Sequence, residues 1–287
     1  MARLAGKLLS DTTGGMMLRV LAVLLVLLLI SPLAAAAERV ISLGGTVTEI
    51  VYALGEGDRL VADDASSLYP QAATQLPRVG YYRNLSLEGV LSLRPDLLIV
   101  SENAGPPEVL ERVRTMGVRV VTVSDQPGID SLYARVKEVA AALGAVDAGS
   151  KLQARIRASL ERVAAESGTP RRALIVIHRG GPLMSAGAGT SANALLALAG
   201  LENVAANSQG YKPLSEEAMV ALAPEIIITT TTSAESAGGL PAFTARPGVA
   251  ATPAADARRV VAVDDLLLLG MGPRVAEAVG LLREASN

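Results

Sequence analysis

One pattern occurs twice in this 287-residue chain and constrains its fold more than any other feature. It reads Ser-x-Glu-x-x-x-x-Leu-x-Pro followed by an acidic residue and an apolar run, at Ser86–Val100 and again at Ser215–Thr229. The serine predicts a helix cap, the leucine faces a core, and the proline stops the helix before a buried strand. A Gly-Tyr pair precedes each copy, at Gly80–Tyr81 and Gly210–Tyr211. The repetition favours two lobes of similar construction.

Strand-like and helical patterns alternate on both sides of these copies. Helices are expected at Pro107–Met116 and at Thr46–Leu54, where Thr46 and Glu49 have the spacing of a capping box. Short apolar runs predict strands at 39–43, 97–101, 118–123, 173–178, 225–230 and 259–263. This alternation predicts an α/β fold with largely parallel sheets.

Residues 129–168 have an almost wholly helical pattern. A second helical stretch is expected from Ser150 to Ala165, after the glycines Gly144 and Gly149. We therefore expect an N-terminal α/β lobe at 38–128, a helical linker at 129–168 and a C-terminal α/β lobe at 169–287. A single larger α/β domain is the alternative, which length does not exclude.

The N-terminal segment predicts export. The apolar run Val20–Ile30 is followed by small residues at Ala34–Ala37 that suit signal peptidase. This run is shorter than the roughly 20 apolar residues of a membrane span, which favours a cleaved signal peptide at residues 1–37 over an uncleaved anchor. The mature protein is then expected in the periplasm. Its translation start is open between Met1, Met16 and Met17.

Charge and cysteine content exclude several classes of function. The chain has a net charge of −2, and loss of residues 1–37 removes three basic and one acidic side chain, which leaves −4. With no cluster of Lys and Arg, the sequence has no basic footprint for nucleic acid. The absence of cysteine excludes disulfides, thiolate metal sites, cysteine nucleophiles and a lipid-modified N-terminal cysteine.

Four stretches resemble a known family. Residues 40–55 resemble the opening of the cluster A, or class III, periplasmic binding proteins, and 76–96 are similar to the haem-binding branch of that family. Residues 185–194 and 269–274 also look like that branch. The block Gly-Tyr-x-Arg-x-Leu-Ser-x-Glu-Gly within 76–96 is the specific part, whereas the opening suits siderophore or cobalamin binders equally. The resemblance extends from about residue 39 to residue 282.

This resemblance implies an architecture and a role. The fold would be two Rossmann-like lobes joined by a single long helix, with the ligand held in the cleft between them. The implied protein is a monomer and not an enzyme. It would bind haem for iron uptake and deliver it to the permease and ATPase of an ABC transporter.

Tyr81 is the expected axial ligand of the haem iron. A phenolate is a hard anionic oxygen ligand, and haem proteins do use axial tyrosine. Arg83 lies two residues on, so both side chains would point the same way from an extended segment, and the resemblance implies that this arginine supports the tyrosine. Tyr82 departs from the apolar residue usual at its position, so Tyr82 stays open as an alternative ligand. Without the surrounding block, a surface tyrosine beside a solvated arginine would be the favoured interpretation.

His178 is the only histidine and ends a strand-like run. Strand ends in open α/β sheets face the ligand crevice, where a distal or second axial role is possible. We favour a polar side chain at the cleft edge with no bond to iron. Tyr211 repeats the position of Tyr81 and is expected on the other wall of the cleft.

The haem propionates need cationic or amide partners. A guanidinium matches the geometry of a carboxylate, and a helix N-terminus offers free amides. The candidates for the propionates are Arg179, Arg274, and Thr46 with the amides that follow Gly44 and Gly45.

Glu88 and Glu217 occupy equivalent points of the two repeats. The family uses one acidic residue on each lobe to dock onto arginines of the transporter. Two surface glutamates at helix N-termini, where the helix dipole favours them, are the alternative. Their paired placement favours docking.

Three rival functions fit the sequence less well. The chain has no Trp, one Phe and six Tyr, and this scarcity of aromatic residues argues against corrinoid and siderophore ligands. Gly187–Ala192 matches the dinucleotide fingerprint G-x-G-x-x-A, but residues 208–213 lack the acidic residue that should follow. No G-x-S-x-G motif supports a hydrolase. An adhesin-like module would explain neither the repeat nor the Gly-Tyr block.

The number of haems and the coordination of the iron stay open.

Overall fold

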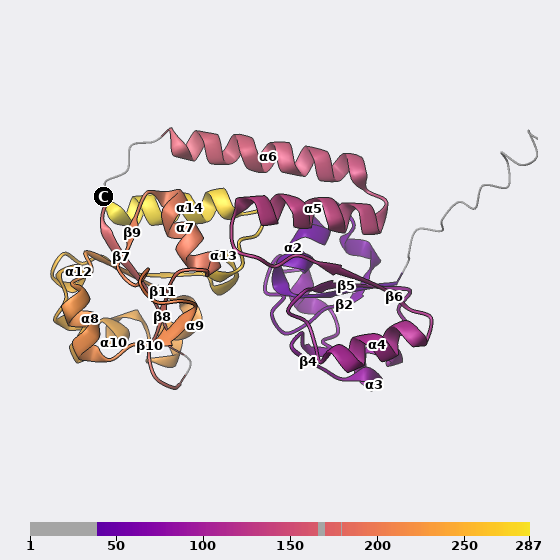
Figure 1. Cartoon of the computed structure of the whole chain (residues 1–287), viewed down its shortest axis with the longest axis horizontal. Coiled ribbons are helices and arrows are strands. Elements are labelled where there is room, and N and C mark those ends of the chain that lie inside the picture. Colours follow the sequence, from indigo (N-terminus) through magenta and orange to yellow (C-terminus); the bar gives the residue numbers. More distant parts are fainter. Residues whose placement is uncertain (1–38, 166–169, 179) are drawn as a thin grey trace, which may run out of the picture. The chain divides into compact units, whose positions relative to one another are not determined.

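The computed structural model describes residues 39–165, 170–178 and 180–287 (Figure 1). The predicted signal peptide at 1–37 lies outside these residues. Within them, no helix is long and apolar enough to cross a membrane. By its contacts the chain from Ala37 to Asn287 forms one compact unit.

The first sheet, with the elements around it, occupies residues 39–123, which we call the β1–β6 region. Its four strands are all parallel in the order β2-β1-β5-β6, and β3 and β4 form a separate antiparallel hairpin. The elements in chain order are β1 (Val40–Leu43), α2 (Gly45–Ala53), η1 (Gly57–Arg59), β2 (Leu60–Ala62), η2 (Ala73–Gln75), β3 (Gly80–Tyr81), β4 (Asn84–Leu85), α3 (Leu87–Ser92), β5 (Leu97–Ser101), α4 (Pro107–Thr115) and β6 (Arg119–Val123).

The second sheet, in the β7–β12 region (residues 172–263), has the order β10-β8-β7-β11-β12, with β9 also paired to β7. Strands β7, β11 and β12 are parallel, whereas β8 and β10 join antiparallel. Its elements are β7 (Arg172–Ile177), β8 (Met184–Ala186), α7 (Ser191–Ala199), β9 (Glu202–Asn203), β10 (Tyr211–Pro213), α8 (Glu216–Leu222), β11 (Ile226–Thr230), α9 (Thr231–Ser236), α10 (Leu240–Thr244), α11 (Pro247–Ala250), α12 (Pro253–Asp256) and β12 (Val260–Val263).

Four further helices complete the described chain. They are α5 (Ile129–Leu143), α6 (Val146–Ala164), α13 (Asp265–Leu269) and α14 (Val275–Ser286). Helix α6 packs against α5, which lies on α2 of the β1–β6 region, and against α14, which lies on α7 of the β7–β12 region (Figure 1). The long helix therefore contacts helices that belong to both sheets.

Burial on both faces explains why the central strands are continuous apolar runs. In β5, Leu97 and Ile99 join the cluster beneath α2, α5 and α6, while Leu98 and Val100 join the cluster on the opposite face. Strand β7 divides its side chains in the same way between the shared cluster and a cluster below the second sheet. Successive side chains of a strand point to opposite faces, so a strand covered on both sides is apolar throughout.

The predicted strands and the α/β fold are confirmed, with strand boundaries shifted by at most one residue. The domain boundaries at 128 and 168 stay predictions. The predicted capping box at Thr46 is wrong, because α2 begins at Gly45 and its N-cap residue Gly44 makes no side-chain cap hydrogen bond.

The predicted start of the second linker helix at Ser150 is also wrong. Gly144, in the left-handed conformation, ends α5, but α6 begins at Val146 and runs through Gly149. A Cβ atom on Gly149 would lie 2.5 Å from Cβ of Ala140. Gly149 is therefore a close contact between α5 and α6 and does not interrupt the helix.

The repeated sequence pattern corresponds to the same local structure in both regions. The hydroxyl oxygens of Ser86 and Ser215 each accept a cap hydrogen bond of 3.2 Å at the start of α3 and α8. Each helix is followed by a non-glycine residue in the left-handed region, Arg94 with φ 46° and Ala223 with φ 42°. Such a conformation is uncommon outside glycine, so its recurrence at the same step marks one structural unit used twice.

The acidic residue of each pattern anchors the neighbouring strand. Asp96 accepts a hydrogen bond from the backbone N–H of Arg39, just before β1, and Glu225 accepts one from that of Arg172 at the start of β7. The side chains of Arg39 and Arg172 also donate to carbonyl groups at the C-terminal ends of α3 and α8, those of Leu93 and Leu222 respectively. The pattern thus joins helix, turn and adjacent strand.

Substitution of Gly149 by alanine tests the close contact between α5 and α6. The added methyl group should force the helices apart, at a cost of about 1–3 kcal/mol. Gly280→Ala in α14 is the matched control, because nothing lies within 4 Å of its Cβ position, and alanine should add up to about 1 kcal/mol of helix stability there. Urea melts should place Gly149→Ala below Gly280→Ala; equal gains in both would contradict the close contact.

Candidate ligand-binding site

Tyr81 lies on the β3–β4 hairpin. It pairs with Asn84, so Tyr82 and Arg83 form the two-residue turn. Tyr81 is 42% exposed, whereas Tyr82 is only 9% exposed. Of the two adjacent tyrosines, Tyr81 is therefore the one accessible to a ligand.

Arg83 contacts the neighbour of Tyr81 rather than Tyr81 itself. The extended segment on which their predicted common direction rested is wrong, because residues 82 and 83 turn the chain. The guanidinium carbon of Arg83 lies 5.2 Å from the ring centroid of Tyr82. That ring meets the ring of Tyr81 edge-on, with 4.8 Å between centroids. Both Arg83 and Tyr81 thus contact the ring of Tyr82.

The environment of Tyr82 disfavours its phenolate. Burial, the neighbouring Tyr81 and a hydrogen bond with Tyr81 raise the pKa of Tyr82 to about 12, although Arg83 opposes this shift. A buried phenol that holds its proton is a poor anionic ligand. The geometry and the pKa therefore both favour Tyr81 over Tyr82 as the ligand.

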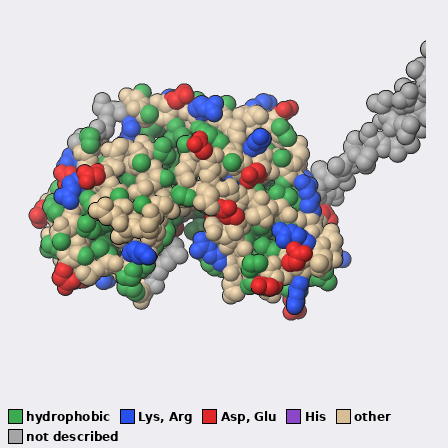
Figure 2. Space-filling model, in the orientation of Figure 1, with side chains coloured by type: hydrophobic (Ala, Val, Ile, Leu, Met, Phe, Trp, Pro, Cys, Tyr) green, Lys and Arg blue, Asp and Glu red, His purple; other side chains and the backbone are tan. Residues whose placement is uncertain are grey.

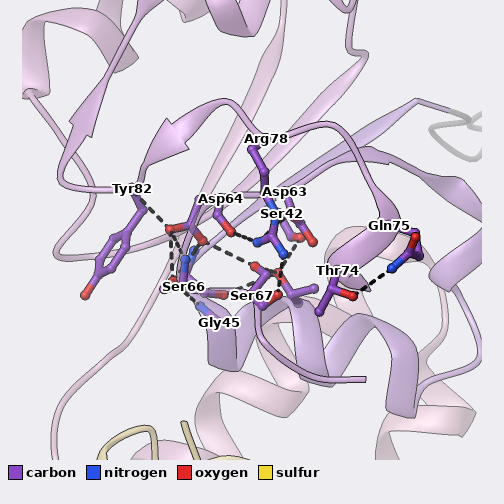
Figure 3. A network of polar contacts seen from close by, with 12 residues as sticks. Ser42, Gly45, Asp63, Asp64, Ser66, Ser67, Thr74, Gln75, Arg78 and Tyr82 are labelled. Atoms are coloured by element: carbon purple, nitrogen blue, oxygen red, sulfur yellow. Dashed lines mark hydrogen bonds and ion pairs between the residues drawn. The ribbon is translucent and has the colours of Figure 1, made fainter. Parts of the chain in front are cut away.

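Asp64 joins the hairpin to the start of α2 (Figure 3). Its carboxylate accepts hydrogen bonds from the backbone N–H groups of Gly44 at 2.9 Å, Ser66 at 3.0 Å and Tyr82 at 3.1 Å. The hydroxyl groups of Ser66 and Ser67 donate to it as well. Asp64 is fully buried.

Arg78 closes the same network from the other side. Its guanidinium donates to the carbonyl oxygens of Asp64 and Ser67 and forms an ion pair with Asp63 at 3.2 Å. Burial raises the pKa of Asp63 to about 7, with Arg78 opposing and Asp64 adding to the rise. Asp63 is thus a buried carboxyl group that titrates near neutral pH.

His178 follows the carboxyl end of β7 and is 8% exposed. Its backbone N–H donates to the hydroxyl of Ser233. Its Nδ1 atom is buried and has no hydrogen-bond partner among the described residues. Buried polar atoms are normally paired, so an orphaned imidazole nitrogen marks a position where a ligand can supply the partner.

Tyr211 begins β10 and pairs with Ala186 on β8. It is 40% exposed, close to the value for Tyr81. The two tyrosines of the Gly-Tyr pairs are thus both accessible in short antiparallel strands, with Tyr81 at the end of β3 and Tyr211 at the start of β10. Arg179, the predicted propionate partner next to His178, lies outside the described residues.

Arg274, a second predicted propionate partner, is engaged within the protein. Its Nε donates to the carboxylate of Glu49 at 3.2 Å, and its guanidinium stacks on Tyr69 with 3.6 Å to the ring centroid. Burial raises the pKa of Glu49, which Arg274 opposes. This partly buried pair leaves little of the guanidinium for a propionate.

The Thr46 hydroxyl and the first two amides at the start of α2 also have partners within the protein. The Thr46 hydroxyl donates to the carbonyl oxygen of Gly270 at 2.9 Å. The amides of Gly44 and Gly45 donate to Asp64 and Ser66. The two amides just before those predicted for a propionate are therefore satisfied by side chains from residues 64–66, while the role of the amides that follow stays a prediction.

Glu88 and Glu217 both lie exposed in the first turn of a short helix, α3 and α8 respectively. The pKa of Glu217 is lowered by hydrogen bonds from its own backbone N–H and from Ser215. Both glutamates thus have equivalent, solvent-facing positions that a partner can reach.

The glycine-rich run at 187–192 is a packed turn. A Cβ atom at Gly187 would lie 2.1 Å from the carbonyl oxygen of Ser208, and the run follows the antiparallel strand β8. A dinucleotide site needs the turn after a parallel strand, with open space for the pyrophosphate. The resemblance to the dinucleotide fingerprint is thus a local coincidence.

Charged side chains of both signs are interspersed on the face drawn in Figure 2. No large patch of Lys and Arg covers that face. This agrees with the absence of clustered basic residues in the sequence.

Comparisons with known proteins place the chain in a class. The profile described as periplasmic binding protein matches residues 40–266, and the chain belongs to this family of solute-binding proteins.

Two solved structures and one curated relative are particularly similar. The periplasmic haem-binding protein RhuT from Roseiflexus sp. RS-1 is 39% identical, with a TM-score of 0.82 and coverage of 87% of this chain and 97% of that one. A periplasmic haem-binding protein from Pseudomonas aeruginosa is 38% identical, with a TM-score of 0.80 and coverage of 87% and 92%. A vitamin B12-binding protein from Yersinia pestis (strain Pestoides F) is 31% identical over 222 residues, which are 76% of this chain and 78% of that protein.

Sequence reasoning missed the residues that hold the hairpin. Asp63, Asp64, Ser66 and Ser67 form a run of small polar residues between β2 and η2, which resembles an ordinary loop. Asp and Ser often bond nearby backbone groups in turns, and that signal was available. The contact of Asp64 with Gly44 and Tyr82, 20 and 18 residues away, had no local signal.

Substitution of Asp63 by asparagine tests its raised pKa. The folded state holds the proton more tightly than the unfolded chain, whose pKa is near 3.8. The resulting stability is complete below about pH 4 and is lost as the pH rises through 7. Wild-type protein should therefore lose stability between about pH 4 and pH 7, and Asp63→Asn should flatten the curve by about 1–3 kcal/mol. Thermal melts across this range provide the measurement; parallel curves for both proteins would contradict the assignment.

Proposed function

We propose that this protein captures haem outside the cytoplasm and delivers it to the permease and ATPase of an ABC importer. The observation that carries the proposal is the exposed Tyr81 on a firmly held hairpin, in a chain whose structural neighbours include haem-binding proteins at 38–41% identity. The predicted signal peptide at 1–37 supports export to the periplasm.

Tyr81 is the proposed axial ligand. A ferric iron favours an anionic oxygen donor, and the ion itself lowers the pKa of a phenol that it binds, which is ordinarily about 10. The adjacent Tyr82 keeps its proton, because its pKa is about 12. A protonated neighbour can donate a hydrogen bond to the bound phenolate, and Arg83 adds positive charge behind that ring.

The remaining ligand contacts are proposed from the β7–β12 region. His178 offers a buried nitrogen without a partner among the described residues, and Tyr211 offers an exposed phenol. We assign them to the wall of the ligand site opposite Tyr81 and not to the iron. Arg179 remains the proposed partner of the propionates, since Arg274 and Thr46 bind within the protein.

Cobalamin is the second candidate ligand, because a vitamin B12-binding protein is among the relatives. Corrinoid sites commonly use aromatic stacking. The single Phe, Phe243, is fully buried in the core of the second sheet, and the chain has no Trp. This leaves the tyrosines as the aromatic surface, which favours haem.

Titration with hemin tests the axial ligand. Tyr81→Phe should abolish the phenolate-to-iron charge-transfer band and weaken binding by more than about 100-fold, beyond the roughly 10–100-fold that loss of an outer partner usually costs. Tyr82→Phe and Tyr211→Phe, which remove the same hydroxyl group elsewhere, should keep the band. Cyanocobalamin serves as the competing ligand.

Two outcomes would contradict the haem proposal. A band that survives in Tyr81→Phe and disappears in Tyr82→Phe would move the ligand to the buried tyrosine. Tighter binding of cyanocobalamin than of hemin by the wild-type protein would replace haem by a corrinoid.

Glu88 and Glu217 are the proposed docking residues. Charges at the rim of an interface govern encounter and orientation more than the affinity of a separate ligand site. Glu88→Lys with Glu217→Lys should leave hemin titration unchanged and stop hemin uptake by the reconstituted importer. Glu161→Lys with Glu277→Lys, both exposed and equal in charge change, is the control. Normal uptake by the first double variant, or equal loss in the second, would discard the docking role.

A further inference from the structure

We propose that Asp64 is the positioning residue of the haem ligand Tyr81, a role that rests on the proposed function. Its carboxylate lies beneath the hairpin and fixes the backbone next to Tyr81 (Figure 3). Asp64 itself does not contact the ligand, because it is fully buried.

Three separate segments converge on this one carboxylate. The N–H of Gly44 comes from the turn between β1 and α2, that of Ser66 from the loop after β2, and that of Tyr82 from the hairpin turn. Both carboxylate oxygens only accept hydrogen bonds, so they can satisfy several N–H and O–H donors at once. The position of Tyr82 is thereby tied to the sheet through Gly44.

Backbone hydrogen bonds complete the hold on both sides of Tyr81. The N–H of Ala65 donates to the carbonyl oxygen of Gly80 at 2.8 Å, and the N–H of Gly105 donates to that of Tyr82 at 2.9 Å. Residues 80 and 82 are therefore fixed, while Tyr81 between them stays exposed. Asp64 adds the one side-chain contact to this set, through its hydrogen bond with the N–H of Tyr82.

The second contribution of Asp64 is to the neighbouring loop. The Ser66 hydroxyl donates to Asp64 and accepts from the N–H of Gly45. Arg78 holds the carbonyl oxygens of Asp64 and Ser67. These contacts hold the carboxylate of Asp64 in one orientation. A residue that positions a metal-binding side chain needs to be fixed in this way.

An axial bond depends on where the phenol oxygen lies. A ligand that is preorganised binds without the cost of being ordered on contact, and loss of a supporting partner typically costs about 10–100-fold in metal affinity. Replacement of Asp64 by asparagine would turn an NH2 group toward backbone N–H donors. The hairpin should then lose its fixed position while Tyr81 keeps its hydroxyl group.

The test compares Asp64→Asn with a matched control. Asp96→Asn also removes a carboxylate that accepts a backbone N–H, in the same region but on the exposed side away from the hairpin. Asp64→Asn should weaken hemin binding by about 10–100-fold and shift or broaden the charge-transfer band. Asp96→Asn should change neither, and near-ultraviolet circular dichroism checks that both variants fold.

A double-mutant cycle separates positioning from a general structural effect. In the Tyr81→Phe background, Asp64→Asn should cause no further loss of hemin affinity, because its effect acts through the Tyr81 ligand. Ser66→Ala is a milder variant that keeps the carboxylate but removes one of its supports. It should cause a smaller loss in the same direction, also erased by Tyr81→Phe, and it replaces Asp64→Asn if that variant does not fold.

The possible outcomes are distinct. Wild-type affinity and an unchanged band in Asp64→Asn, with loss in Tyr81→Phe, would overturn the role of Asp64 alone. An equal loss from Asp64→Asn with and without Tyr81 would assign Asp64 to the overall structure instead. Wild-type protein that binds no hemin would overturn the proposed function, and the positioning role with it.

Discussion

The buried carboxylate of Asp64 is the point at which the loops beside the first sheet meet. It satisfies the N–H of Gly44, and Ser66 beside it satisfies that of Gly45, so together they take the place of a local cap for α2. The same carboxylate holds Tyr82 and thereby the exposed Tyr81. The start of α2 and the hairpin turn beside Tyr81 thus both depend on the carboxylate of Asp64. A buried polar network of this kind is stable only while its members remain paired.

A second set of contacts joins the segment 270–274 to the β1–β6 region and to α5. Thr46 donates to the carbonyl of Gly270, Arg135 donates to that of Met271, and Glu49 pairs with Arg274. A Cβ atom on Gly270 would lie 2.9 Å from the Thr46 hydroxyl, so the glycine allows this approach. Residues that locally resemble a capping box therefore serve long-range contacts instead, and Arg274 is not available to the ligand.

The two regions share one structural unit, and their differences lie in what surrounds it. Both regions contain the same four features in the same order: a serine that caps a helix, a residue in the left-handed conformation, an acidic residue that anchors the next strand, and a central strand. This order accounts for the equivalent positions of Glu88 and Glu217. The residues after the two Gly-Tyr pairs differ. Tyr81 begins a tight hairpin, whereas Tyr211 begins a strand paired with β8. The repeat thus places an accessible tyrosine in each region but builds the proposed iron ligand in one.

The sequence by itself determined the α/β alternation, the buried strands and the repeated unit, because these follow from periodicity and turn residues within a few positions. It also singled out Tyr81 and the paired glutamates. Only the tertiary structure decided that Gly149 is a contact between α5 and α6 and that Arg83 lies over Tyr82. It also decided that Thr46 bonds to the carbonyl of Gly270 and that Glu49 pairs with Arg274. The contacts of Asp64 were likewise decided only by the tertiary structure. Its partners lie about 20 residues away along the chain, and which donors reach a buried carboxylate depends on how distant loops pack, for which no local pattern exists.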